Sequence, residues 1–439
     1  MQSLRTSEPT ELDVKKMRSK DNSAAVASAL DKSDSLAPLR RKFAFPRHKD
    51  SAAIYLCGHS LGLMPKRVPK AVGHELDVWA NSAVHGHFSA AGGWFDYHKR
   101  LTPQLAKLAG ARQAEVVAMN SLTVNMHLLL ASFFRPQGRR SKIVLEAGAF
   151  PSDRYAAVSQ LQHHGLDPTV NLLELEPQDP NVGLTAADLD ACLQRNANEV
   201  AVVWLPGVQY LSGQVLNIRA LTRVAHQHGA LIGFDLAHAI GNIPLRLHAW
   251  EVDIAVWCGY KYLNGGPGAI GGCFVHDKHG NQALPRLAGW WGHDESRRFL
   301  MEPDFRPIPG AQGWQLSNPP ILAMVALRVA LDLHMRAGIH NLHKKSTRLS
   351  AFLQSALETQ CGKSVQIITP DKPALRGAQL SLQLSGQSVS AQHVAEALEQ
   401  FGVIVDTREP NIIRMAAAPI YNNFKDVHGA VKALKKVLA

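Results

Sequence analysis

Lys261 is the residue of this chain whose surroundings most favour covalent chemistry. It follows the apolar run Asp253–Trp257 and lies between Tyr260 and a glycine-rich loop. We expect the apolar run to form a buried strand, which would place the lysine amine at the edge of a sheet and partly out of water. Desolvation lowers the pKa of a lysine and frees its amine to attack an aldehyde. A surface lysine whose stem packs on apolar atoms is the alternative interpretation.

Asp235 supplies the second group that such chemistry requires. It ends the apolar run Ala230–Phe234, and His238 follows three residues later at a predicted strand-to-helix turn. A carboxylate in this place could keep the pyridine nitrogen of pyridoxal phosphate protonated, so that the ring can accept electrons. A helix-capping aspartate is the alternative. Lys261 and Asp235 on neighbouring strands together predict an enzyme that uses pyridoxal phosphate.

Two further segments could bind such a cofactor. Ser121–Thr123 precedes an apolar helical segment, where free N–H groups and a hydroxyl would suit a phosphate, although a plain N-cap is the commoner explanation of such a segment taken alone. Phe150 ends another predicted strand and could stack on the ring, with Ser152 and Asp153 beside it. A strand-end aromatic followed by a helix cap remains the alternative for that segment.

Apolar runs and amphipathic segments alternate from residue 115 to residue 275. This alternation predicts a mostly parallel sheet with helices on both faces and a ligand beyond the carboxyl ends of its strands. A long helical stretch and short strands follow Pro319 and Pro320. We expect an N-terminal segment over 1–64 that packs on the small domain, with a loose beginning, a large cofactor-binding domain over 65–319 and a small C-terminal domain over 320–439.

Composition excludes several other classes of protein. The chain has 46% apolar residues and a net charge of +11, and its basic residues are scattered, so we expect no nucleic-acid partner. The longest apolar run, Leu128–Phe134, is too short for a membrane span, and the N-terminus has no signal peptide. Five cysteines without a CxxC pair predict a reduced, cytoplasmic protein, and histidine pairs outside an HExxH motif predict no metal site.

Seven sequence blocks make the chain resemble the kynureninase family from about Leu36 to the C-terminus. In chain order they are GHSLGL, NSLTVNMHLL, FPSD, GFDLAHAIGN, YKYLNGGPG, GWWGH and SNPPI. The resemblance implies the α/β fold of fold-type I pyridoxal-phosphate enzymes, with a mostly parallel seven-stranded sheet and a smaller α+β domain. It also implies hydrolysis of the Cβ–Cγ bond of kynurenine or 3-hydroxykynurenine, in tryptophan catabolism and NAD biosynthesis, by a homodimer with shared active sites.

The resemblance also implies a role for each matching residue. Lys261 would bind the cofactor covalently and move the substrate Cα proton, Asp235 would hold the pyridinium N–H, and Tyr260 would donate or relay a proton. Further cofactor contacts would come from Leu122, Thr123, Phe150, Pro151, Ser152, Asp153, His238, Tyr260 and, across the dimer interface, Trp290 and Asn318. The substrate would contact Ser60, His87, Asn318 and Arg414, whose guanidinium would clamp its α-carboxylate.

Three positions depart from patterns common in the family. His59 stands where Asn is frequent, Pro206 where some members have Ser, and Gly259 where a hydroxyl residue is common. Each change would remove or move one polar contact, which bears on the affinity for the cofactor.

The preferred aryl group depends on the side chains that face the substrate ring. A site lined by His87, Ser317 and Asn318 could hydrogen-bond a 3-hydroxyl group, so we expect a preference for 3-hydroxykynurenine.

Two other interpretations of the protein's function stay open. The chain could be another fold-type I enzyme, a desulfurase or an aminotransferase, or it could be a non-catalytic nucleotide-binding α/β protein. A desulfurase would need a cysteine on a loop near the site, and no cysteine has that setting.

Overall fold

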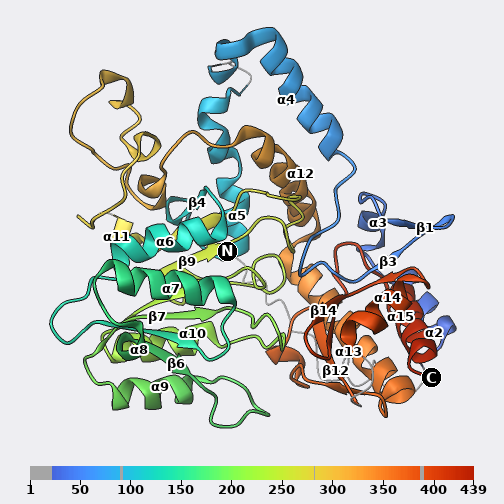
Figure 1. The fold of residues 1–439 in the computed structure, drawn as a ribbon. Helices are drawn as coiled ribbons and strands as arrows, with labels where there is room; N and C mark the ends of the chain where they lie inside the picture. The colour runs from blue at the N-terminus through green and yellow to red at the C-terminus, as the bar shows by residue number, and fades with distance from the viewer. Residues whose placement is uncertain (1–21, 89–91, 281, 386–389) are drawn as a thin grey trace, which may run out of the picture.

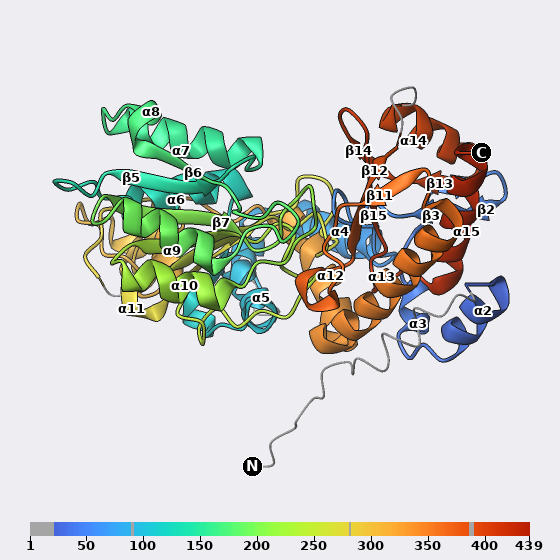
Figure 2. The same cartoon turned by 90° about the horizontal axis from the view of Figure 1, so that it is seen from below.

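The structure, a computed structural model, describes residues 22–88, 92–280, 282–385 and 390–439. It has two lobes that lie side by side, one built on a large sheet and the other containing the C-terminus (Figures 1 and 2). Among the described residues no helix is both long and apolar enough to cross a membrane.

A seven-stranded sheet forms the centre of the large lobe, in the order β4-β10-β9-β8-β7-β5-β6. Neighbouring strands from β9 to β6 run parallel, while β10 runs antiparallel to both of its neighbours, so the predicted mostly parallel sheet is confirmed. The strands are β4 (Val116–Ala118), β5 (Lys142–Glu146), β6 (Leu172–Leu175), β7 (Val200–Pro206), β8 (Leu231–Asp235), β9 (Ile254–Trp257) and β10 (Gly272–Val275).

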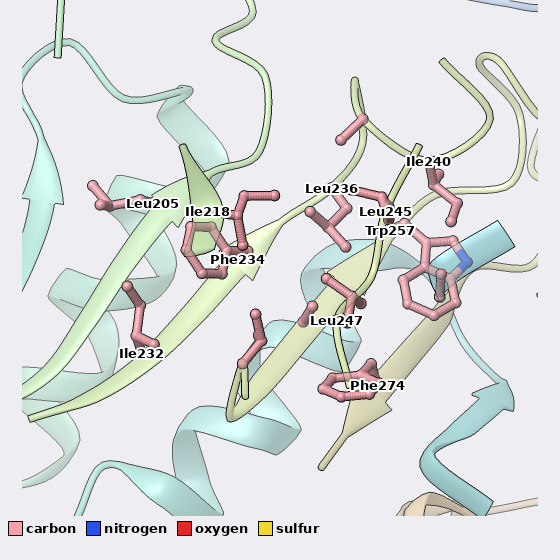
Figure 3. Close-up of a cluster of buried hydrophobic side chains, with 14 of the residues drawn as sticks. Leu205, Ile218, Ile232, Phe234, Leu236, Ile240, Leu245, Leu247, Trp257 and Phe274 are labelled. Atoms are coloured by element: carbon pink, nitrogen blue, oxygen red, sulfur yellow. The ribbon is translucent and has the colours of Figure 1, made fainter. Parts of the chain in front are cut away.

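Both faces of this sheet are buried, because successive residues of each strand point into different apolar clusters. Val202 and Trp204 of β7 face one cluster, while Val203 and Leu205 face the other, part of which is drawn in Figure 3. This explains why the strands are apolar without alternation. The first cluster includes side chains of α6 (Leu122–Phe133) and α7 (Pro151–His163); the second includes side chains of α5 (Thr102–Ala109), α9 (Ala186–Arg195), α10 (Ile218–Gln227) and α12 (Ile321–Ala337).

The small lobe contains an antiparallel four-stranded sheet in the order β11-β12-β15-β14. Helix α13 (Ile339–Cys361) and helix α15 (Phe424–Val437) cover it and share one apolar cluster with its strands. The remaining elements of the lobe are β11 (Val365–Ile367), β12 (Gln379–Leu384), α14 (Ala391–Glu399), β13 (Val403–Ile404), β14 (Asp406–Arg408) and β15 (Ile412–Ala416).

The described part of the N-terminal segment packs on the small lobe, and its last turn also contacts the large lobe, where the Gly62 N–H donates to the Tyr260 carbonyl. Strand β3 (Ile54–Tyr55) pairs in parallel with β13, and α2 (Ala24–Lys32) packs against α15. The other elements of this segment and of the following connection are α3 (Ala37–Arg40), β1 (Arg47–His48), β2 (Ser51–Ala52) and α4 (Val68–Ser82).

Several predicted elements differ from the structure at glycine, proline or short polar segments. The helical stretch predicted after Pro320 is two helices in the structure. Gly338, with a φ of 74°, ends α12, and α13 begins at the next residue. Within the predicted alternation over 115–275, strand β6 begins only at Leu172, because Asp167 caps the short helix α8 (Pro168–Asn171) just before it. Strand β14 was not predicted, since it has three polar residues in sequence.

Candidate active site

The candidate site lies where β5, β7 and β8 end and where the chain continues beyond β9. Its lining residues come from these strand ends and from the first turns of α6 and α7. They are Leu122, Thr123, Leu145, Glu146, Ala149, Phe150, Ser152, Asp153, Trp204, Pro206, Val208, Tyr210, Asp235, Ala237, His238, Tyr260 and Lys261. This is the edge at which parallel sheets bind their ligands.

Lys261 borders this pocket beside two aromatic rings. Its Nζ lies 5.8 Å from the centroid of the Phe150 ring and 6.0 Å from that of the Tyr260 ring. The backbone around it is held by the turn after β3: Gly62 N–H donates to the Tyr260 carbonyl over 2.8 Å, and a Cβ at Gly62 would lie 2.4 Å from the Lys261 carbonyl oxygen. The glycine therefore permits the GHSLGL turn to dock against the lysine segment.

Asp235 is buried between its neighbours in the sheet, Pro206 of β7 and Val256 of β9. The Ala237 N–H donates to its Oδ1 over 2.6 Å. Burial raises the pKa of Asp235, while the charge of Lys261 and the Ala237 hydrogen bond oppose that rise. A buried carboxylate that a nearby cation keeps ionised can bind a protonated ring nitrogen.

Asp153 lies close to Asp235 and shares its protonation equilibrium. Burial and then the charge of Asp235 raise the pKa of Asp153 well above its ordinary value, and Asp153 in turn lowers the pKa of Asp235 as a hydrogen-bond partner. Of the two carboxyl groups, Asp153 is therefore the one that holds a proton. This leaves the negative charge on Asp235.

Two helix N-termini open toward the pocket. Ser121 occupies the N-cap position of α6 and Phe150 that of α7, and neither side chain makes a capping hydrogen bond. The hydroxyls of Thr123 and Ser152, in the first turns of these helices, lie 2.7 Å apart. Uncapped N–H groups beside two hydroxyls form a site suited to a phosphate.

Phe150 and His238 both line the pocket. The Phe150 ring is 41% exposed and meets Tyr210 edge-on at 5.3 Å, which leaves a face free to stack on a planar ligand. His238 is buried, and burial followed by the charge of Lys261 lowers its pKa well below the ordinary value. It is therefore a neutral imidazole near neutral pH.

Arg414 lies in the small lobe, on β15, and reaches toward the pocket. Its Nη1 donates to the carbonyl oxygen of the pocket residue Tyr210 over 2.7 Å, and its Nη2 pairs with Asp406 at 2.7 Å. Within the described part of the chain its Nε–H has no hydrogen-bond partner. Arg414 thus joins the two lobes at the pocket and retains an unused donor.

Four residues that were predicted to contact the cofactor or the substrate do not line the pocket of this single chain. Ser60 and Asn318 are exposed, the His87 ring packs edge-on against Trp94 at 5.4 Å, and the Trp290 indole donates to the Arg298 carbonyl over 3.0 Å. For Trp290 and Asn318 the prediction was a contact across a dimer interface, which one chain does not contain. Pro151 is exposed at the first turn of α7, between two pocket residues.

Sequence reasoning missed two polar residues of the pocket. Glu146 is the last residue of β5, and burial raises its pKa to about 8. Its position at the end of an apolar strand is the same signal that identified Asp235. Tyr210 follows β7 in a loop whose fold depends on Gln209, since the Gln209 Oε1 accepts N–H groups of Leu211 and Ser212 over 2.7 Å each. No sequence pattern marked Tyr210.

The three departures from family patterns have distinct surroundings. His59 is fully buried 3.7 Å from Asp406, and Pro206 lines the pocket beside Asp235. A Cβ at Gly259 would lie 2.3 Å from the Ile270 carbonyl oxygen, so this backbone leaves no room for a side chain at that position.

Comparison of the chain with solved structures identifies its fold. It superimposes with a TM-score of 0.75 on a lysine-to-alanine mutant of C-DES with glycine covalently linked to its PLP cofactor, at 19% identity, over 90% of this chain and 98% of that one. The cysteine desulfurase CsdA from Escherichia coli gives the same TM-score at 18% identity, over 92% and 98% of the two chains. At these identities the likeness shows the fold. All five cysteines of this chain are buried, unlike the exposed loop thiol expected of a desulfurase.

Sequence comparison identifies the family. Residues 342–434 match the model of the kynureninase C-terminal domain. The chain is 48% identical to the kynureninase of Xanthomonas oryzae pv. oryzae (strain PXO99A) and 49% identical to that of Xanthomonas campestris pv. campestris (strain B100). Each match spans 406 residues, which are 92% of this chain and 96% of the relative. The chain therefore belongs to the kynureninase family of pyridoxal-phosphate-dependent hydrolases.

Proposed function

We propose that the pocket at Lys261 hydrolyses the Cβ–Cγ bond of 3-hydroxykynurenine or kynurenine, releasing alanine and the corresponding anthranilate. The observation that carries this proposal is the convergence of a lysine amine, a buried carboxylate and an exposed aromatic face in one pocket beside two uncapped helix N-termini. Similarity to kynureninases over nearly the whole chain supports the same reaction, and with it a place in tryptophan catabolism and NAD biosynthesis.

The residues present fit pyridoxal phosphate. Asp235 would hold the pyridine N–H, Phe150 would cover one face of the ring, and Thr123 and Ser152 would bind the phosphate with the N–H groups of their helices. Lys261 would hold the cofactor through its aldehyde until the substrate amino group takes the place of the lysine amine, and the cofactor would then supply a conjugated ring that withdraws electrons from the substrate Cα.

Side chains of this protein would carry out the proton transfers. Lys261 Nζ would remove the Cα proton and hold it, while the negative charge of Asp235 keeps the ring nitrogen protonated. Burial raises the pKa of the Tyr260 phenol, so that group stays protonated and can donate at its Oη. Water would add to the γ-carbonyl of the substrate, and the Cβ–Cγ bond would break with its electron pair left on Cβ, which releases the aryl acid. Protons delivered to Cβ and then to Cα would complete alanine.

The substrate carboxylate would bind Arg414. A guanidinium presents its N–H groups in one plane, and Arg414 has a free Nε–H while Nη2 faces Asp406. An incoming carboxylate would take the Nε–H and compete with Asp406 for Nη2. Since Arg414 also binds the Tyr210 carbonyl, substrate binding would act on the contact between the two lobes.

We expect this enzyme to prefer 3-hydroxykynurenine to kynurenine, because His87, Ser317 and Asn318 can hydrogen-bond a ring hydroxyl. None of the three is fully buried in the single chain, so a partner subunit can approach them. Measuring kcat/KM for both substrates with purified holoenzyme tests the proposal and the preference together. A higher value for kynurenine would refute the preference, and no alanine released from either substrate would refute the function.

The same proposal includes a homodimer, supported by an exposed apolar surface near the predicted interface residue Trp290. Phe88, Phe299, Leu300 and Met301 are each more than half exposed, and Phe299 contacts both Phe88 and Trp290 through its ring. A contiguous apolar patch of this kind on a water-soluble protein marks a contact with another chain.

The proposal also includes the division of the chain into domains. The N-terminal segment over 1–64 would pack on a small domain over 320–439, and residues 65–319 would form the large domain. The buried cysteines would stay reduced, which fits a cytoplasmic location.

A further inference from the structure

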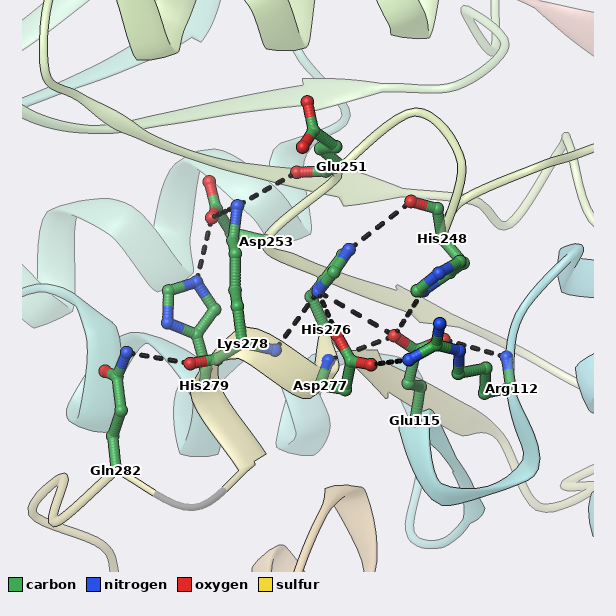
Figure 4. Close-up of polar contacts among 10 residues, drawn as sticks. All are labelled: Arg112, Glu115, His248, Glu251, Asp253, His276, Asp277, Lys278, His279 and Gln282. Atoms are coloured by element: carbon green, nitrogen blue, oxygen red, sulfur yellow. Dashed lines mark hydrogen bonds and ion pairs between the residues drawn. The ribbon is translucent and has the colours of Figure 1, made fainter.

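A second cluster of chemically competent side chains lies at the end of the central sheet opposite the pocket (Figure 4). Glu115 precedes β4, His248 lies in the connection that leads to β9, and His276 and Asp277 follow β10. One donor atom from each of these four residues lies within 4.8 Å of the other three. The sequence predicted no metal site because these residues come from three separate segments and match no ligand spacing.

Each of the four residues turns one donor atom toward a common centre. His248 Nδ1 lies 2.8 Å from Glu115 Oε1, His276 Nδ1 lies 3.8 Å from the same oxygen, and Asp277 Oδ1 lies 2.8 Å from His276 Nδ1. Ligands at about 2.0–2.1 Å from a tetrahedral zinc ion are separated by about 3.3 Å. The observed separations bracket that value.

Glu115, Asp277 and His276 each have a second polar atom, which points away from the centre and contacts a neighbouring group. Glu115 Oε2 accepts the Arg112 N–H over 2.8 Å, Asp277 Oδ2 pairs with the Arg112 guanidinium, and His276 Nε2 lies 3.3 Å from the His248 carbonyl oxygen. Donation from Nε2 to that carbonyl leaves the lone pair of His276 on Nδ1, which faces the centre. Outer partners of this kind fix the orientation and tautomer of metal-binding side chains.

Charge and access are compatible with a cation at this place. The two carboxylates outweigh the single charge of Arg112, and the nearby Lys278 ammonium is paired with Asp253 at 2.7 Å. The His248 and Asp277 side chains are 30% and 36% exposed, which gives an ion a path from solvent. A bound ion would displace the Lys278 N–H, which now lies 3.2 Å from His276 Nδ1, and would share Glu115 Oε1 with the Asp277 N–H that donates to it over 3.0 Å. It would also shift the His248 proton from Nδ1 to Nε2.

We propose that Glu115, His248, His276 and Asp277 bind one divalent transition-metal ion, with Zn²⁺ as the ion best suited to two imidazoles and two carboxylates. The ion would tie the start of β4 to the end of β10 and to the connection before β9. Its role would be structural, because all four positions would be filled by protein ligands and the site lies away from Lys261.

The chain offers a matched control for the test. His226 binds the buried carboxylate of Asp253 at 2.9 Å with a side chain that is 29% exposed, which closely parallels His248 on Glu115, yet His226 is not one of the four ligands. The pyridoxal-phosphate-loaded wild-type protein, His248→Gln and His226→Gln are dialysed against ZnCl₂ and then against metal-free buffer, and the zinc per chain is measured by mass spectrometry.

Wild type and His226→Gln should retain one zinc per chain, whereas His248→Gln should lose it or bind at least about tenfold more weakly. Zinc should also raise Tm in the first two proteins, by about 2 °C or more, and leave His248→Gln unchanged. Asp277→Asn, at an exposed ligand, replaces His248→Gln if the latter does not fold. Retention of no zinc by wild type, or equal retention by the ligand and control variants, would overturn the proposal and identify the cluster as a hydrogen-bonded ion-pair network.

Discussion

At the scale of single residues, the pocket separates groups that stay charged from groups that stay neutral. Burial raises the pKa of Asp235, but the charge of Lys261 and the Ala237 hydrogen bond oppose that rise, whereas burial raises the pKa of Asp153 well above its ordinary value and that of Glu146 to about 8. Tyr260 also stays protonated because burial raises its pKa. One fixed negative charge among neutral donors is what a protonated pyridine ring requires.

Tyr260→Phe should retain the cofactor and lose turnover. The substitution removes only the phenolic Oη, so stacking near Lys261 is preserved while the proposed proton donor is lost. We expect kcat to fall by about 10²-fold, the usual contribution of a positioned general acid. Steady-state kinetics and the absorbance of the bound cofactor check this. Turnover at the wild-type rate would show that Tyr260 is not a proton donor.

Glu146 should make the protein less stable as the pH rises toward 8. Its pKa is about 8 in the folded protein against 4.5 for the exposed group in the unfolded chain, so the folded state binds more protons between these values and stability falls with rising pH there. The slope contributed by one such group is at most about 1.4 kcal/mol per pH unit. Glu146→Gln should therefore lose less stability than wild type between pH 6 and pH 8 in chemical unfolding experiments. Parallel curves for the two proteins would contradict this assignment.

At the scale of elements, the site depends on where strands end and on how the two lobes meet. The ends of β5, β7 and β8 bring Glu146, Pro206 and Asp235 to one edge of the sheet. The loop after β7 then carries the Tyr210 carbonyl to Arg414 on β15. If Arg414 binds the substrate carboxylate as proposed, substrate binding would act on the contact between the lobes.

Arg414→Lys should weaken substrate binding more than catalysis. Lysine keeps the charge but cannot hold Tyr210, Asp406 and a carboxylate in one plane. Loss of one charge-assisted hydrogen bond, about 1.5–3 kcal/mol, corresponds to a rise in KM of about 10-fold to 100-fold with kcat within about threefold of wild type. Arg408→Lys is the matched control, since Arg408 pairs with the same Asp406 at 2.5 Å from a more exposed position. Equal changes in KM for both variants would place the α-carboxylate elsewhere.

The positions of the strand ends explain which site residues could be predicted from the sequence. Asp235 and Lys261 were predictable because apolar runs with defined ends place the next residue at a sheet edge. Phe150 was predictable for the same reason, and Glu146 could have been. The pairing of Arg414 with Asp406 was not predictable, because β14 is too polar and too short to be identified, and its register with β15 is set by tertiary packing. The Gly338 break between α12 and α13 was missed in a stretch with continuous helical periodicity.

At the scale of the whole molecule, one chain provides the cofactor pocket and leaves part of the predicted substrate site outside it. Asn318 is exposed, and Trp290 lies within the apolar surface around Phe299. These residues belong to a site only if a second subunit covers that surface. No pattern in a single sequence specifies such a contact, and the prediction came from family resemblance alone.

Co-expression of two inactive variants tests the shared site. Lys261→Ala lacks the amine, and Asn318→Ala lacks the group expected to reach the partner's pocket. If dimers form at random, half of them are hybrids, and each hybrid has one site with both residues intact. The mixture should therefore recover about a quarter of wild-type activity, while each variant alone shows little. No recovery, or full activity of Asn318→Ala alone, would contradict the shared site.

The most direct test of the central claim is the chemical identity of the lysine that binds the cofactor. The purified holoenzyme is reduced with borohydride, digested, and its peptides are mapped by mass spectrometry. The structure predicts that the pyridoxyl label is found on Lys261, where the amine lies beside Phe150 and its charge acts on Asp235. A label on any other lysine, or a protein that takes up no label after loading with pyridoxal phosphate, would contradict the account.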